Sequence, residues 1–106
     1  MKHIPLSVFL MILIVSSAAT AQSSAPEAIY KTKCAMCHGP DGSAKTPMAQ
    51  KLGIKSFQSP EIQNQSDAEL KRAIAQGKNK MPAFGKSLTE EQIAGLLKHI
   101  RELGKK

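Results

Sequence analysis

The chain of 106 residues lacks tryptophan, has one tyrosine and three phenylalanines, and contains only two cysteines. Two cysteines exclude a framework of several disulfides. So few aromatic residues leave little material for a large core, and a chain of this size commonly needs a further stabilising element. No segment alternates apolar and polar residues for long enough to indicate a strand. The sequence therefore predicts one small all-α domain.

The longest apolar run, residues 4–15, follows Lys2 and His3 and precedes small residues that end in Ala19-Thr20-Ala21. This order is typical of a secretory signal peptide with an Ala-x-Ala cleavage site. The run is shorter than the roughly 20 residues that span a bilayer, so we expect cleavage after Ala21 and no stable membrane insertion. We expect a signal peptide over residues 1–21, a single domain over residues 22–106, and a periplasmic location.

Basic residues outnumber acidic ones, and the whole chain has a net charge of +7. Without residues 1–21 it keeps 14 Lys and Arg against 8 Asp and Glu, a net charge of +6. The lysines are dispersed and no aromatic stacking motif accompanies them, which disfavours nucleic acid as a partner. We expect acidic protein partners, because complementary charge mainly speeds and orients encounters. Lysines that only maintain solubility remain an alternative at each position.

Start and stop signals predict four helices with loops between them. Three of the expected helix N-termini have the pattern of a capping box, a capping side chain followed three residues later by Glu or Gln: Ser24 with Glu27, Ser66 with Glu69, and Thr89 with Gln92. We expect helices over about residues 24–34, 48–52, 66–77 and 89–103. Apolar residues at helical spacing show that one face of the last helix must be buried: Ile93, Leu96, Leu97, Ile100 and Leu103.

Both cysteines stand in the run Cys34-Ala35-Met36-Cys37-His38, which is the attachment signature of a c-type haem. Two thiols at this spacing can reach the two vinyl groups on one edge of a porphyrin, and the adjacent imidazole then lies under the iron. The run predicts one heme c, held covalently through Cys34 and Cys37, with His38 as the proximal iron ligand. A porphyrin, apolar on both faces, would also compensate for the scarcity of aromatic residues.

A second iron ligand can come from Met48, Met81 or His99, because Met36 is held between the two cysteines and cannot reach the far face. Met48 suits a core position, and His99 suits a packed histidine in the last helix. Met81 lies in a loop and precedes Pro82, which stiffens the backbone. We therefore expect Met81 to be the distal ligand. A histidine and methionine pair raises the reduction potential and leaves no open iron position for a substrate.

Together these residues resemble small class I single-haem c-type cytochromes, the soluble periplasmic cytochrome c family. The run from Tyr30 to Gly39, the helix ending at Gly77, the loop Met81-Pro82-Ala83-Phe84-Gly85 and the last helix occur in the family's order. The resemblance implies a cytochrome c fold, about four short helices wrapped around one covalently attached haem. It also implies that four residues bind the cofactor: Cys34 and Cys37 as anchors, and His38 and Met81 as the ligands of the iron.

The same resemblance implies a function. Family members are single-electron carriers, not enzymes, that shuttle electrons in the periplasm between a reductase and an oxidase or dehydrogenase, and we expect a monomer. The first and last helices are expected to cross, with an aromatic residue of the last helix meeting a small residue of the first. His99 occupies the aromatic position, and Pro26 occupies the position where the family commonly has glycine.

Several alternatives stay open. A thioredoxin-like dithiol would need a βαβ setting, and a zinc site would need a fourth ligand besides Cys34, Cys37 and His38. A disulfide between the cysteines would leave His38 and Met81 unexplained. Two further alternatives keep the haem. In one, the protein is a permanent haem subunit of a larger redox complex. In the other, Met81 is not a stable ligand and the protein is an open-iron haem enzyme or sensor.

Overall fold

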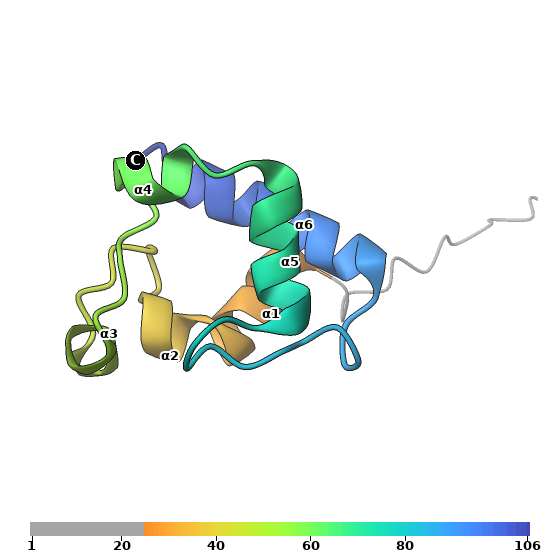
Figure 1. Cartoon of the computed structure of the whole chain (residues 1–106), viewed down its shortest axis with the longest axis horizontal. Coiled ribbons are helices and arrows are strands. Elements are labelled where there is room, and N and C mark those ends of the chain that lie inside the picture. The colour runs from red at the N-terminus through yellow and green to blue at the C-terminus, as the bar shows by residue number, and fades with distance from the viewer. Residues whose placement is uncertain (1–24) are drawn as a thin grey trace, which may run out of the picture.

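The computed structural model describes residues 25–106, so the predicted signal peptide and its cleavage site lie outside the described residues. The described part is helical and contains one isolated β-bridge, between Lys78 and Met81. The all-α prediction is confirmed. Across these residues no helix is long and apolar enough to cross a membrane. The helices, shown in Figure 1, are α1 (Pro26–Lys33), α2 (Ala35–His38), α3 (Pro47–Leu52), α4 (Pro60–Gln63), α5 (Asp67–Gln76) and α6 (Glu90–Leu103).

The four predicted helices correspond to α1, α3, α5 and α6, and their ends follow from local chemistry. Thr89 and Gln92 form the predicted capping box at the start of α6, and the Ser66 hydroxyl accepts from the Glu69 N–H at the start of α5. Ser24, where a further capping box was predicted, lies outside the described residues. Ala25 is the N-cap of α1 and has no side-chain cap, and Pro26 follows at the first helical position, where its missing N–H has no consequence.

Helix α6 is the centre of the fold, and α1 and α5 both pack against it (Figure 1). Its predicted apolar face is buried as expected. Each aliphatic side chain that leaves water in this way contributes roughly 1.5–3 kcal/mol. The core is completed by residues of α1, α5 and the loops, with Tyr30 and Leu96 the most deeply buried large side chains. Cys34 and Met81, two of the predicted site residues, are partly buried against this core.

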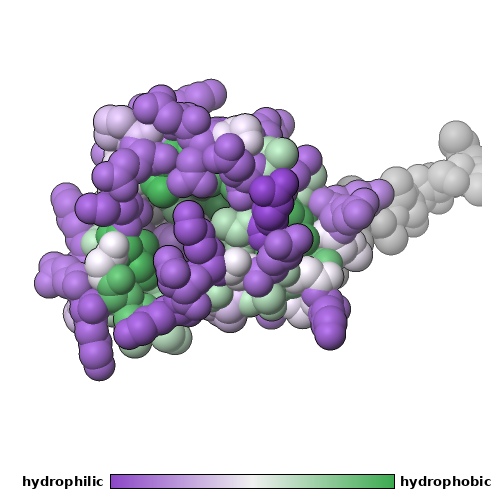
Figure 2. All heavy atoms as spheres, viewed as in Figure 1, coloured by the Kyte–Doolittle hydropathy of each residue, from purple (hydrophilic) through white to green (hydrophobic). Residues whose placement is uncertain are grey.

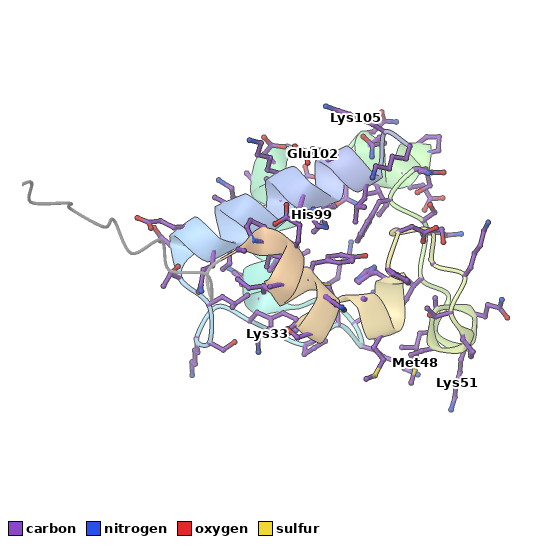
Figure 3. The ribbon with its side chains drawn as sticks, turned by 180° about the vertical axis from the view of Figure 1, so that it is seen from behind. Lys33, Met48, Lys51, His99, Glu102 and Lys105 are labelled. Carbon is purple, nitrogen blue, oxygen red and sulfur yellow. The ribbon has the colours of Figure 1, made fainter. Side chains whose placement is uncertain are left out.

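The crossing of α1 and α6 is present, but its small residue lies on the opposite helix from the one expected. A β-carbon on Gly95 of α6 would lie 2.9 Å from Cγ of Pro26, so Gly95 is what allows the two helices to approach. His99 lies on the side of α6 that faces α1 (Figure 3), and its ring meets the Tyr30 ring edge-on with centroids 5.1 Å apart. The aromatic contact therefore involves a tyrosine of α1, and Pro26 packs against a glycine.

Arg101 of α6 fastens the segment between α4 and α5. Its guanidinium donates to the carbonyl oxygens of Gln63 and Gln65, at 3.3 and 2.6 Å, and forms a 3.0 Å ion pair with Asp67. The arginine side chain is 23% exposed, so these bonds are partly shielded from water. One side chain thus joins the last helix to the turn that precedes α5.

We predict that Arg101→Met lowers the free energy of unfolding by about 1–2 kcal/mol, because two backbone carbonyls lose a charged donor. Urea unfolding of the purified variant measures this loss. Arg72→Met is the matched control, since Arg72 is exposed on α5 and its replacement should change stability by less than about 0.5 kcal/mol. Equal effects of the two substitutions would contradict the fastening role of Arg101.

Candidate functional site

The two cysteines and His38 lie on a short helical turn, α2 with its N-cap Cys34, that directly follows α1. Cys34 ends α1 by donating its N–H to the Tyr30 carbonyl, at 2.9 Å, and its own carbonyl accepts from the His38 N–H at 3.0 Å. Both thiols are half-buried and free, so they are not joined in the disulfide considered above. Burial is the main cause that raises the pKa of the Cys34 thiol; neighbouring Lys33 opposes this shift and Cys37 adds to it.

Groups from outside the helical turn hold its three last carbonyls. The Thr46 hydroxyl donates to the Cys37 carbonyl at 2.8 Å, the Ala44 N–H donates to the His38 carbonyl at 2.9 Å, and the Tyr30 hydroxyl donates to the Gly39 carbonyl at 2.6 Å. Burial, with smaller effects from Cys34 and Asp41, raises the pKa of Tyr30. The phenol therefore keeps its proton and remains a donor at ordinary pH. These three bonds fix the position of the cysteines and His38.

The imidazole of His38 lies against the ring of Phe57, nearly parallel, with centroids 4.8 Å apart. Gly42 makes room for this aromatic ring, because a β-carbon there would lie 2.5 Å from Cδ2 of Phe57. Burial lowers the pKa of His38 and so favours the neutral ring that binds metals. Among the described residues, His38 Nδ1 is the one buried side-chain nitrogen or oxygen without a hydrogen-bond partner.

A cavity of about 540 Å³ lies beside this turn, within the roughly 300–1,000 Å³ typical of cofactor sites. Cys34, Cys37, His38 and Met81 all line it, and neither Met48 nor His99 is among its lining residues. Most of the remaining wall is apolar, from α4, α5, α6 and the loops. In the view of Figure 2, hydrophobic side chains are visible among polar ones in the area framed by α3, α4 and α5.

The residues around this cavity suit a c-type haem. Two free thiols, a half-buried imidazole and a thioether are the groups that bind such a cofactor, and the apolar wall suits a porphyrin. The unpartnered His38 nitrogen shows that the imidazole makes incomplete use of its bonding capacity within the polypeptide. In contrast, no three His, Cys, Asp or Glu side chains of residues 25–106 gather as a metal site, so the zinc alternative has no support there.

Charge is distributed unevenly around the cavity. Four lysines line it, and the described residues of its wall include no Asp or Glu: Lys33, Lys55, Lys78 and Lys80. Lys33 adjoins the cysteine run, Lys80 adjoins Met81, and Lys78 is three residues before Met81. Lys55 is near neither, and only its place in the folded chain reveals it.

Comparison with known proteins agrees with this site. Residues 21–100 match the family described as cytochrome C oxidase, cbb3-type, subunit III. The chain belongs to this family of c-type cytochromes. It is also similar to a cytochrome c6 of Rippkaea orientalis (strain PCC 8801 / RF-1), with 29% identity over 96 residues that cover 88% of this chain and 81% of the relative. Family membership makes it a small single-haem c-type cytochrome, and so an electron-transfer protein that binds haem and iron.

The sequence did not indicate two of the groups that shape this cytochrome site. Phe57 lies in a loop far along the chain from His38, and no local pattern connects them. The hydrogen bond from the Tyr30 hydroxyl to the Gly39 carbonyl was also not predicted. The two residues stand on either side of the cysteine run, nine positions apart, and that spacing was the one signal available in the sequence. Met48, considered as a ligand, lies on α3 with 39% of its surface exposed (Figure 3) and does not line the cavity.

We predict that Tyr30→Phe lowers the free energy of unfolding by about 1–2 kcal/mol, because the buried Gly39 carbonyl loses its donor while the ring remains. Denaturant unfolding of the haem-loaded cytochrome gives the value. Thr32→Val is the control, since the Thr32 hydroxyl donates only to carbonyls of its own helix. A Tyr30→Phe protein as stable as the wild type would show that this bond does not hold the turn.

Proposed function

We propose that the protein is a single-electron carrier in which His38 and Met81 are the axial ligands of one heme c attached through Cys34 and Cys37. The observation that carries this proposal is that these four residues line one cavity, whereas the competing ligands Met48 and His99 do not. Bound haem would supply one-electron chemistry at its iron, with a reduction potential that the two axial ligands and burial adjust.

The protein's own groups have positioning roles in this proposal. The two thiols would anchor the cofactor, and the stacked Phe57 ring and three carbonyl bonds restrict movement of His38. Met81 would occupy the remaining axial position. With both positions filled, no substrate can bind the iron, so we propose no catalytic residue and no enzymatic activity.

The lysines around the cavity support transient contact with acidic redox partners, such as a reductase and an oxidase or dehydrogenase. Positive charge beside the cavity speeds and orients encounter with such a partner more than it strengthens the complex. We further propose that residues 1–21 are a cleaved signal peptide, that the protein acts in the periplasm as a monomer, and that it remains free of nucleic acid and membrane.

A second candidate function is a haem subunit of a larger redox complex. The name of the matching family favours it, because that name describes a subunit of an oxidase. The open-iron haem enzyme or sensor has less support: the described residues that line the cavity include no Asp or Glu, and the charged groups closest to Met81 in the sequence are lysines.

The role of Met81 as the distal ligand can be tested by substitution. In Met81→Ala, haem should remain attached, and the affinity of the ferric protein for cyanide should rise at least about tenfold, which corresponds to about 1.4 kcal/mol, because the thioether no longer competes. Optical titration with cyanide measures this affinity. Met48→Ala is the matched control and should bind cyanide as the wild type does. Unchanged cyanide binding in Met81→Ala would remove Met81 from the axial role.

The effect of the cavity lysines on electron exchange can be tested at Lys55. In Lys55→Glu, oxidation of the reduced protein by anionic ferricyanide should slow by roughly twofold to fivefold at low ionic strength, and added salt should reduce the difference. Stopped-flow kinetics gives both rates. Lys105→Glu makes the same charge change near the end of α6, away from Lys33 in Figure 3, and should have a smaller effect. Equal slowing by the two substitutions would show that only the net charge matters.

A further inference from the structure

The backbone of Met81 is held by a two-residue turn. The Lys78 N–H donates to the Met81 carbonyl at 3.2 Å, and the Met81 N–H donates to the Lys78 carbonyl at 2.9 Å. Asn79, the first residue inside the turn, has a φ of +54°, in the left-handed region. Turns with a positive φ at this position favour Gly, Asn or Asp. The conformation of Asn79 therefore decides whether the two bonds can form together.

The turn is braced against α5 on both sides. Gly77, which ends α5 with a φ of +76°, lies so close to the turn that a β-carbon on it would be 2.6 Å from the Met81 carbonyl oxygen. Beyond Met81, the Phe84 and Gly85 N–H groups donate to the Ile74 and Ala75 carbonyls, each at 2.9 Å. The segment between these points has little freedom, so the direction of the turn determines where the Met81 side chain enters the cavity.

We propose that Asn79 is the positioning residue for the Met81 ligand, and that it acts through its left-handed backbone and not through a contact of its side chain. The side chain is exposed, so its replacement removes little packing; because Asn79 also lines the cavity, the comparison of Asn79→Gly with Asn79→Ala tests whether the lost side chain itself matters. The inference rests on the proposed role of Met81 as the distal ligand. It predicts that the strength of the bond from Met81 to iron follows the ease with which residue 79 adopts a positive φ.

Three substitutions at one position separate backbone from side chain. Glycine adopts a positive φ freely, alanine does so with strain, and β-branched valine does so least readily. The proposal therefore expects Asn79→Gly to behave like the wild type, Asn79→Val to weaken the Met81 ligand most, and Asn79→Ala to lie between them. Asn64→Val is the matched control, because Asn64 is also exposed but has a φ of −81°.

The experiment uses the haem-loaded ferric proteins and imidazole as the competing ligand. In Asn79→Val, the imidazole affinity should rise on the order of tenfold, or about 1.4 kcal/mol, and the weak far-red absorption of methionine-coordinated ferric iron should decrease. Asn79→Gly and Asn64→Val should keep wild-type affinity and absorption. If Asn79→Val does not attach haem, the order of the wild type, Asn79→Gly and Asn79→Ala tests the same expectation.

Two results would overturn the inference: wild-type imidazole affinity in both Asn79→Val and Asn79→Ala, or an equal rise in Asn79→Gly and Asn79→Ala, which would assign the effect to the lost side chain. Failure of the proposed function looks different. In that case the wild-type protein itself lacks the far-red absorption and binds imidazole as tightly as Met81→Ala does.

Discussion

The attachment of α2 to the rest of the molecule is the constraint on which the site depends. Its carbonyls are bound by groups that come from α1 and from the loop before α3. Tyr30 is central, because its hydroxyl reaches Gly39 while its ring is packed in the core and meets His99 of α6. The crossing of α1 and α6 therefore determines where the cysteines and His38 lie. A small chain with few aromatic residues achieves this by placing its one tyrosine at that junction.

The two sides of the cavity are held by different physical means. On one side, an aromatic ring stacks on His38 and burial disfavours its charged form. On the other, backbone bonds and close approach at Gly77 restrict the segment that carries Met81. The first side depends on packing and the second on backbone conformation, so they should respond differently to substitution. Lysines from both sides line the cavity, where they can influence encounter without adding to the core.

Much of this arrangement could be predicted from the sequence because its signals are local. The cysteine run specifies its chemistry within five residues, and side-chain caps with helical spacing indicated α5 and α6. Helices α2 and α4, each of four residues, are too short to show a periodic pattern. Phe57 and Lys55 reach the site only through folding, and no spacing in the sequence joins them to His38. The exchange of small and large residues between Pro26 and Gly95 depends on how two distant helices meet, which a single sequence does not record.

The most direct test of the central claim is the visible absorption spectrum of the exported wild-type protein, oxidised and then reduced. The account predicts a c-type reduced spectrum together with the weak far-red absorption of methionine-bound ferric iron. A c-type spectrum without that absorption would contradict ligation by Met81 and favour an open-iron protein. A protein with no haem spectrum, produced in a host able to attach haem, would contradict the whole account of the site.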